Sequence, residues 1–418
     1  MTEGNFAFFN SHSALSHPAC RQTGALNIWI SVKITLTKSY IVSNTQLTKG
    51  VEFDKQIKMN AQELENLRKK IDTLDESILK LLNQRAQIAF KVGALKSKNN
   101  LNFWDPKREQ EIFKRIEKLN TGPLPNQALF SIFHEIITAT RELQHPTKVA
   151  FLGPETTFSH MAAIKHFGKT ALFYPLPTIK DVFWEVEKGQ YDYGVVPVEN
   201  SIEGTVAYTL DLFMQSELKV CGEIYLKINH YLASLTHKKE NIEKIYAHPQ
   251  AVAQCRNWLS HHFPKIAVEE VRSTALAAQK AKDDPKSAAI TTKLAIEKYG
   301  LNVLEKYIED FAHNTTRFWI IGQTSLHPTG QDITSLIFAI PDKPGALYQA
   351  LKPFAERQIN LTKLESRPMK SLPWHYLFFV NLDGHCSESP VKDALNELKK
   401  ICAHLKILGS YPKAYERK

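Results

Sequence analysis

Cysteine is scarce in this chain, with five among 418 residues, at Cys20, Cys221, Cys255, Cys386 and Cys402. No two of them form a CxxC pair or have the spacing of a zinc site, so the sequence predicts neither a disulfide framework nor a metal centre. Long apolar runs are also missing, which argues against a transmembrane helix. The first residues lack the basic start, sustained apolar run and cleavage site of a secretory signal. Together these absences predict a cytoplasmic protein with reduced thiols.

Basic runs interleaved with aromatic residues are absent too, although the formal net charge is +10. Without such a run or a base-stacking module, the charge does not predict a nucleic-acid-binding protein, and anionic small-molecule substrates explain it better. The content of 43% hydrophobic and 23% charged residues is that of a soluble globular protein. A chain of 418 residues is too long for one ordinary core and predicts two or three domains.

The most regular stretch, Ala61–Lys98, predicts a long amphipathic helix. Arg85 occupies one slot of its apolar stripe, where a guanidinium is costly unless an anion pairs with it. Lys96 lies about 20° round the helix from Arg85, and Arg68 lies roughly 100° away. Two cations on one face indicate a dicarboxylate site in a helical bundle, but a coiled coil with one buried polar residue remains an alternative. The stripe recurs at 3-4 spacing through Leu64, Leu67, Ile71, Leu74, Ile78, Leu81, Ile88, Val92 and Leu95.

Two further helices are predicted, at about residues 103–119 and 126–144. Asp105 before Pro106 has the pattern of an N-cap followed by the first helical residue. Glu109 is either a site residue or a partner of Arg108, and Asp105 is either a site residue or only a cap. Near the end of the third helix, Thr140 and Gln144 stand four apart and share a face.

These three helices resemble the all-helical chorismate mutase domain of bifunctional chorismate mutase–prephenate dehydratases. The resemblance implies an intertwined homodimer in which two arginines bind the carboxylates of chorismate, one of them from the partner chain. A lysine and a glutamine would face the ether oxygen. Where Thr140 stands, the family often has serine. The chorismate-binding residues implied by the resemblance are Arg68 (the arginine given to the partner), Arg85, Lys96, Asp105, Arg108, Glu109, Thr140 and Gln144.

From residue 147 to 323 short apolar runs alternate with helical segments, which predicts an α/β domain. The runs lie at residues 148–153, 171–175, 191–198, 244–249, 266–271, 287–291 and 317–322. Hydroxyls and amides follow several of them, and open α/β sheets bind ligands at such turns. Helix N-termini with Ser or Thr bind carboxylates, although plain N-capping is the alternative for any single turn.

The motifs of this region resemble prephenate dehydratase from end to end. They are FLGPETTFSH, YGVVPVENSIEGTV, HPQAVAQC, RSTALAA and His313–Phe318, HNTTRF. The resemblance implies a two-lobed fold like periplasmic binding proteins, with Thr316 as the catalytic hydroxyl, Arg317 as a carboxylate clamp and Phe318 as a wall of the cleft. Glu199 and His313 are alternative proton sources behind Thr316. Lesser candidates are Thr157, Ser159, Glu199, Asn200, Ser201 and Thr274. Thr156 occupies a position where the family usually has glycine, whose backbone angles are less restricted.

Residues 333–412 have the order βαββαβ, which is typical of a ferredoxin-like α+β fold. They resemble the ACT regulatory domain, and two motifs imply a phenylalanine pocket across a dimer interface. The motifs are Gly345-Ala346-Leu347 and Glu365-Ser366-Arg367-Pro368. Tyr348 stands where the family often has valine. Residues 1–58 fit none of these patterns, and we interpret them as a loosely ordered extension or as residues before a natural start at Met59.

The sequence therefore predicts a multidomain enzyme: an all-α mutase domain at 59–145, a two-lobed α/β dehydratase domain at 147–323 and an ACT domain at 333–412. It would convert chorismate to prephenate and prephenate to phenylpyruvate, carbon dioxide and water, without metal or cofactor, under feedback inhibition by L-phenylalanine. Two alternatives are a non-catalytic metabolite sensor built from the same folds and a dehydratase that prefers arogenate.

Overall fold

The computed structural model describes residues 47–99, 101–368 and 376–414. The chain divides into two units, residues 1–81 and 82–418. Residues 1–46 of the predicted extension lie outside the described residues. None of the described helices is both long and apolar enough to cross a membrane.

Helix α2 runs from Leu47 to Lys98 and so begins earlier than the predicted start at Ala61. Residues 47–58 of the predicted extension are therefore part of this helix. The physical reason is that no proline interrupts the segment, so the backbone hydrogen bonds continue once the helix has started. The apolar stripe of α2 is exposed along its length; Leu74, for example, is 62% exposed and Ile88 63%.

Helices α3 (Pro106–Leu119) and α4 (Asn126–Glu142) complete the helical region. The Asp105 side chain accepts a hydrogen bond from the Arg108 backbone at 3.0 Å, which confirms the predicted N-cap. Within the second unit, Gly93 of α2 lies against Gln144, and a Cβ at this glycine would come within 2.7 Å of that side chain. Trp104, 5% exposed, stacks edge-on against His166 and Tyr193 and so joins the α2–α3 connection to the α/β region.

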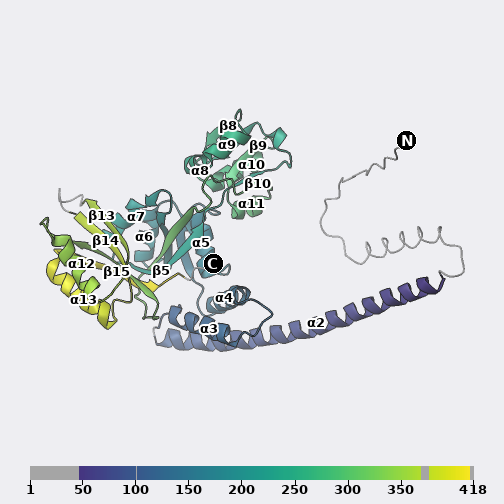
Figure 1. The fold of residues 1–418 in the computed structure, drawn as a ribbon, viewed down its shortest axis with the longest axis horizontal. Coiled ribbons are helices and arrows are strands. Elements are labelled where there is room, and N and C mark those ends of the chain that lie inside the picture. The colour runs from purple at the N-terminus through teal and green to yellow at the C-terminus, as the bar shows by residue number, and fades with distance from the viewer. Residues whose placement is uncertain (1–46, 100, 369–375, 415–418) are drawn as a thin grey trace, which may run out of the picture. The chain divides into compact units, whose positions relative to one another are not determined.

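The first lobe is built on a sheet with strand order β2-β1-β3-β11-β5, to which β4 adds at β3. Strands β1 to β3 are parallel, and β11 runs antiparallel to both β3 and β5. Figure 1 shows this sheet with its helices. The elements are β1 (Lys148–Leu152), α5 (Phe158–Phe167), β2 (Leu172–Leu176), α6 (Ile179–Glu187), β3 (Tyr193–Asn200), β4 (Gly204–Thr205), α7 (Ala207–Gln215), β5 (Lys219–Lys227) and β11 (Thr315–Gly322).

The second lobe has its own sheet, with order β10-β6-β9-β7-β8. The chain enters it after β5 and returns to the first lobe at β11, which confirms the predicted two-lobed arrangement. Strands β4, β5, β6 and β10 were not among the predicted runs, because they are short or carry Gly and Glu within the apolar pattern. The elements are β6 (Tyr231–Ser234), η1 (Lys239–Asn241), β7 (Lys244–Ala247), α8 (Pro249–Gln254), α9 (Arg256–His262), β8 (Ala267–Glu270), α10 (Thr274–Asp283), β9 (Ser287–Thr291), α11 (Lys293–Tyr299) and β10 (Asn302–Lys306).

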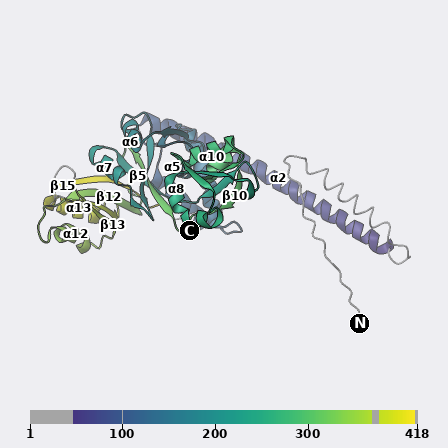
Figure 2. The same cartoon turned by 90° about the horizontal axis from the view of Figure 1, so that it is seen from above.

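The C-terminal domain has the predicted βαββαβ order, in a sheet arranged β13-β14-β12-β15. Figure 2 shows its two helices together on one side of the sheet. Leu336 and Phe338 of β12 pack with these helices, whereas Ile333 and Ile337 of the same strand face the first lobe. The elements are β12 (Asp332–Ala339), α12 (Ala346–Glu356), β13 (Leu361–Pro368), β14 (Tyr376–Asp383), α13 (Ser389–Ile401) and β15 (His404–Pro412).

The C-terminal sheet and the first lobe share one apolar core. Phe379, Leu408 and Tyr411 belong to the same buried cluster as Trp319 and Val220 of the first lobe. At Gly409 of β15 a Cβ would approach the Val220 carbonyl oxygen to 2.2 Å, so only glycine permits this contact. The C-terminal domain is thus in direct contact with the first lobe through buried side chains and, at Gly409, through the backbone.

Candidate functional site

Two of the predicted cations of the helical region, Arg85 and Lys96, make hydrogen bonds to other parts of the chain. Arg85 donates a hydrogen bond from Nη1 to Thr140 Oγ1 and approaches the Ile136 carbonyl oxygen at 3.5 Å. Lys96 Nζ donates to the Phe103 carbonyl oxygen at 2.9 Å. Burial lowers the pKa of Lys96, while the carboxylates of Asp105 and Glu109 raise it. Within the second unit, Arg85 thus contacts Thr140 and Lys96 contacts the connection before α3, whereas Arg68 is exposed in the first unit.

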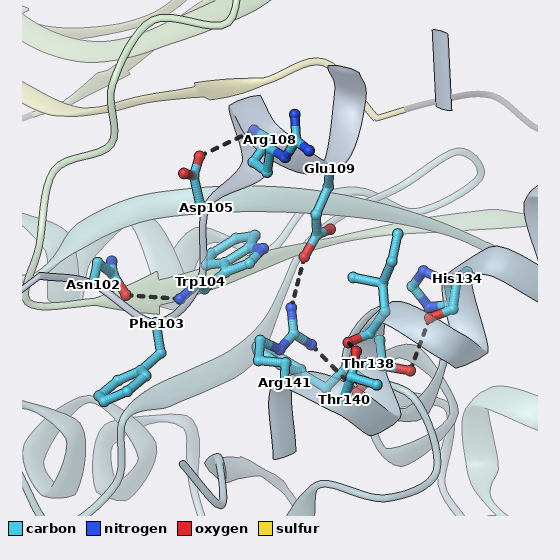
Figure 3. A network of polar contacts seen from close by, with 12 residues as sticks. Asn102, Phe103, Trp104, Asp105, Arg108, Glu109, His134, Thr138, Thr140 and Arg141 are labelled. Carbon is cyan, nitrogen blue, oxygen red and sulfur yellow. Dashed lines mark hydrogen bonds and ion pairs between the residues drawn. The ribbon is translucent and has the colours of Figure 1, made fainter. Parts of the chain in front are cut away.

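Glu109 is not paired with Arg108, one of the two alternatives for this residue. Its carboxylate accepts from Arg141 at 3.0 Å, as Figure 3 shows, and Arg108 instead forms an exposed ion pair with Glu111. Burial raises the pKa of Glu109, and the Arg141 guanidinium opposes this shift. Arg141 is 5% exposed and was missed by sequence reasoning, because its place on α4 carries no motif.

Gln144 follows α4 and remains a candidate contact for a ligand. Its Nε2 lies 3.5 Å from the Thr140 carbonyl oxygen. Its buried Oε1 has no hydrogen-bond partner among the described residues. A buried amide without a partner is costly, so this side chain is suited to bind a polar group in the site.

The two lobes enclose a cavity of about 440 Å³. Six of the nine residues predicted for the dehydratase line it: Thr157, Ser159, Asn200, Thr274, Thr316 and Phe318. The lining also includes residues that sequence reasoning did not single out, among them Glu203, Thr205, His230, His248, Gln254 and Arg272. Arg272 directly precedes the Ser-Thr pair at the start of α10 and is the first residue of the RSTALAA motif, which was a signal for it in the sequence.

The Thr316 hydroxyl oxygen accepts a hydrogen bond from Asn200, and its O–H group can donate a second one. Asn200 Nδ2 donates to Thr316 Oγ1 at 2.9 Å. The orientation of the Asn200 amide follows from its own oxygen, which accepts from the backbone N–H groups of Ile202 at 2.9 Å and Glu203 at 3.1 Å. The Thr316 hydroxyl can therefore donate its proton to a group bound in the cavity.

A buried chain of polar side chains stands behind Asn200. Asn200 donates to Asn314 Oδ1 at 2.7 Å, and Asn314 donates to Gln254 Oε1 at 3.0 Å. The same oxygen lies 2.9 Å from His230 Nε2. Burial lowers the pKa of His230, which is 2% exposed, so we treat its imidazole as neutral. This network of hydrogen bonds holds the Asn200 and Thr316 side chains in one arrangement, although the buried His230 Nδ1 has no hydrogen-bond partner among the described residues.

The N-termini of two helices, α5 and α10, line the cavity. Thr157 caps α5, and Ser273 caps α10 with a hydrogen bond of 3.0 Å from the Leu276 backbone. The N-terminal turn of a helix carries partial positive charge and favours anions. Together with Arg272 in the lining, these termini make the cavity suited to a carboxylate.

Three residues predicted for the dehydratase lie outside the lining. Ser201 Oγ bonds the backbone at Thr315 and His313, at 3.0 and 3.1 Å. Glu199 pairs with Lys363 of the C-terminal domain at 3.0 Å. Arg317 is 6% exposed and points to the opposite face of β11 from its neighbours Thr316 and Phe318. His313, the other proposed proton source, is exposed and also outside the lining.

Thr156, which stands where the family usually has glycine, adopts a backbone conformation that favours glycine. Its φ is +68°, in the left-handed region, although its side chain is 2% exposed. The Thr156 backbone N–H donates to His160 Nδ1 at 3.0 Å, and its carbonyl accepts from Thr292 Oγ1 at 2.7 Å. These contacts from both lobes hold the strained turn in place.

The two predicted effector motifs lie in different surroundings. Gly345 has a φ of +77° and begins α12, with Ala346 and Leu347 partly buried in its first turn. Glu365 accepts from Thr205 Oγ1, and Arg367 forms an ion pair with Asp211 of α7 at 2.9 Å. Among the described residues no hydrogen bond or ion pair joins the two motifs within one chain. Ser366, between them, is exposed.

Comparison with known proteins finds three family models in order along the chain. Chorismate mutase type II matches residues 67–145, prephenate dehydratase matches 149–326 and the ACT domain matches 334–402.

The chain is also similar to whole proteins and to solved structures. It is 50% identical over 357 residues to a bifunctional chorismate mutase/prephenate dehydratase of Aquifex aeolicus, covering 84% of this chain and 99% of that protein. For the protein of the same description from Pseudomonas aeruginosa the identity is 44% over 358 residues, covering 84% and 98%. A crystal structure of prephenate dehydratase from Arthrobacter aurescens in complex with L-Phe matches with a TM-score of 0.59 and 35% identity, covering 64% of this chain and 90% of that chain. This protein therefore belongs to the family of bifunctional chorismate mutase/prephenate dehydratases.

Proposed function

We propose that this protein converts chorismate to prephenate in its helical region and prephenate to phenylpyruvate between its two α/β lobes, under feedback inhibition by L-phenylalanine. The observation that carries the proposal is the Thr316 hydroxyl, whose oxygen is occupied by Asn200 and whose proton is free, in a cavity lined by two helix N-termini. We assign the mutase to residues 59–145, the dehydratase to 147–323 and the regulatory domain to 333–412.

The mutase reaction needs no nucleophile, because it is a pericyclic rearrangement. The protein contributes a compact conformer, held by its two carboxylates, and positive charge at the ether oxygen where negative charge develops. Arg85 and Arg68 would bind the carboxylates, and Lys96 and Gln144 would face the ether oxygen. Asp105, Arg108, Glu109 and Thr140 would orient these groups; the short contact of Arg85 with Thr140 and the pairing of Glu109 with Arg141 support this arrangement.

Arg68 is assigned to the site of a second copy. The exposed apolar stripe of α2 supports a homodimer with an intertwined mutase region, because a stripe of this length is normally buried against another helix. Strand β13 pairs only with β14 among the described strands, so its free edge is a second surface where copies can meet. The effector pocket of Gly345-Ala346-Leu347 and Glu365-Ser366-Arg367 would form between copies.

In the dehydratase reaction, the bond from the ring to its carboxylate breaks and the electron pair forms a ring double bond. Hydroxide leaves with the C–O electron pair and takes up one proton, so that prephenate and a proton give phenylpyruvate, carbon dioxide and water. Thr316 would donate a hydrogen bond to the leaving hydroxyl. Arg272 and the turns at Thr157, Ser159 and Thr274 would bind the carboxylates, and Phe318 would shape the apolar wall.

The test is to incubate the purified full chain with chorismate, without metal or nucleotide, and to follow chorismate loss and phenylpyruvate gain with and without L-phenylalanine. Phenylpyruvate formation that L-phenylalanine suppresses is the expected result. Prephenate that accumulates without phenylpyruvate would contradict the dehydratase assignment, and no turnover would favour the sensor alternative. Parallel assays with prephenate and arogenate compare kcat/KM, and a higher value for arogenate would overturn the assignment of prephenate as the preferred substrate.

A further inference from the structure

Arg317 lies in the middle of the motif that contributes Thr316 and Phe318 to the cavity, but it points away from that cavity. Its guanidinium contacts Glu223 of β5, with Nε at 2.9 Å and Nη2 at 2.7 Å from the same carboxylate oxygen. The side chains of Arg317 and Glu223 are 6% and 2% exposed. Loss of either partner would leave an uncompensated buried charge, so this pair holds β11 against β5 in one arrangement.

The same guanidinium also contacts the C-terminal domain. Arg317 Nη2 donates to Tyr411 Oη of β15 at 3.1 Å, and Tyr411 shares a hydrogen bond of 2.6 Å with Ser335 of β12. With the Asn381 amide oriented to donate to Ser335 Oγ at 2.7 Å, its oxygen accepts from Arg317 Nη1 at 2.8 Å and Nη2 at 3.1 Å. Two strands of the C-terminal sheet, β14 and β15, thus contact the Arg317 side chain, and Ser335 of β12 bonds both residues that make these contacts.

A second connection starts at the predicted effector motif. Lys363 of β13 lies 3.2 Å from Glu365 and 3.0 Å from Glu199, and it donates to Thr205 Oγ1 at 2.9 Å. Thr205 lines the cavity, and Glu199 is adjacent to Asn200, which bonds Thr316. Lys363 is only 15% exposed, so these contacts are weakly screened by solvent.

The two connections meet at Glu199. One carboxylate oxygen of Glu199 faces Lys363 and the other lies 3.7 Å from Arg317 Nη1. A displacement of β13 relative to the first lobe therefore changes the charge around Glu199, and with it the position of the strand segment that carries Asn200. A ligand at the effector motif can shift this equilibrium only if it prefers one arrangement of these contacts.

From this network, and resting on the proposed function, we propose that Arg317 and Lys363 are positioning residues that transmit the state of the C-terminal domain to Thr316. Arg317 does not bind the substrate carboxylate. It joins the catalytic strand to β14 and β15, while Lys363 joins the effector motif to Glu199 and to the wall of the cavity.

The first test compares Lys363→Met with Lys406→Met in the full chain. Lys406 is a matched control, because it is 14% exposed and also bridges the C-terminal domain to the first lobe, bonding the Ser216 carbonyl oxygen at 2.7 Å, but it has no contact with the network. For Lys363→Met we expect basal dehydratase kcat within about threefold of the unmodified protein and half-inhibition at a phenylalanine concentration at least about tenfold higher. Calorimetry should still detect phenylalanine binding. Lys406→Met should leave inhibition unchanged.

Three outcomes would overturn the role of Lys363. One is an inhibition curve for Lys363→Met that coincides with that of the unmodified protein. Another is an equal shift in Lys406→Met, which would indicate a general weakening of the interface. The third is loss of both inhibition and binding, which would make Lys363 a direct effector contact. Absence of dehydratase activity or of inhibition in the unmodified protein would instead contradict the proposed function.

The second test separates positioning by Arg317 from binding of the substrate. Tyr411→Phe removes one hydrogen bond to Arg317 and preserves the ring, and Tyr411 does not line the cavity. We expect kcat for prephenate to fall about three- to tenfold with KM within about twofold, together with a changed response to phenylalanine. Unchanged kcat and response would overturn the proposal. So would Arg317→Met with a KM raised about 100-fold or more at an unchanged kcat, because that pattern indicates a lost substrate contact.

Discussion

All residues that line the interlobe cavity belong to one folded unit, whereas the residues proposed for the helical site are divided between two units. The cavity lies between two lobes of the same unit, and hydrogen bonds link Thr316 through Asn200 to Asn314 and Gln254. In the helical region, Arg85 of α2 bonds Thr140 of α4 and Lys96 of α2 bonds the Phe103 carbonyl oxygen, while the apolar stripe of α2 is exposed. Hydrogen bonds within one chain can hold the groups of the cavity in place. The arrangement of the helical site depends in addition on what packs against the exposed face of α2.

The largest expected effect is that of Arg85→Ala on the mutase reaction. Loss of the guanidinium would remove the proposed charge-assisted contact to the substrate, and we expect kcat/KM for chorismate to fall about 10³-fold or more. Dehydratase kcat/KM for prephenate, measured on the same preparation, should stay within about twofold. A parallel loss of both activities in a folded variant would contradict separate sites.

Thr316→Ala should produce the converse result. Removing the only proposed donor to the leaving hydroxyl should lower dehydratase kcat about 10²- to 10³-fold and leave the mutase unchanged. Thr316→Ser, which retains the hydroxyl, is the matched control and should keep activity within about tenfold of the unmodified protein. If the alanine and serine variants are equally active, the hydroxyl has no role in the reaction.

Mixing two inactive variants tests whether the helical site is shared between copies. Arg68→Ala and Arg85→Ala should each lack mutase activity alone. If each site takes Arg68 from one chain and Arg85 from the other, unfolding and refolding an equal mixture places one intact site in half of the dimers, and about a quarter of the activity returns. No recovery, while dehydratase activity returns fully, would show that both arginines act within one chain.

A smaller effect is expected at the buried pair of Glu109 and Arg141. Arg141→Met removes the cation that opposes the burial of Glu109, so the pKa of Glu109 should rise further above its usual value. We expect the midpoint of the mutase pH–rate profile to move to higher pH, with a fall in kcat of about tenfold at neutral pH. Arg108→Met, which removes only an exposed partner, is the control and should leave the midpoint in place. A midpoint that does not move would mean that Arg141 has no influence on the titration of Glu109.

The smallest effect concerns the turn at Thr156, whose φ is +68°. Thr156→Gly and Thr156→Ala both remove the buried hydroxyl, but only glycine accepts this backbone angle without strain. We expect the glycine variant to be more stable than the alanine variant by about 1 kcal/mol, measured from the first thermal transition of the full chain. Equal stability would indicate that the surrounding contacts relieve the strain.

Much of this architecture could be predicted, because the spacing of apolar residues, local capping patterns and the order of helices and strands are visible in the sequence. The 3-4 spacing of α2, the Asp-Pro start of α3 and the βαββαβ order of residues 333–412 were all visible in the sequence. The start of α2 was misplaced, because no residue between Leu47 and Ala61 marks a helix boundary. Thr157, Ser159, Asn200 and Thr274 stood out because their hydroxyls and amides come at the ends of predicted strands, and Thr316 because its motif resembles that of prephenate dehydratases.

The sequence by itself determined the domain order, the family motifs and the side chains able to hold anions or donate a proton. Only the tertiary structure decided which of these side chains share a surface. Adjacent residues of a strand point to opposite faces, so Thr316 lines the cavity while Arg317 joins the C-terminal domain. The partners of Arg317 and Glu109 are Glu223, Tyr411 and Arg141, which are distant in sequence. Pairings of this kind depend on packing between elements, because a motif records the residue types but not the face on which each one lies.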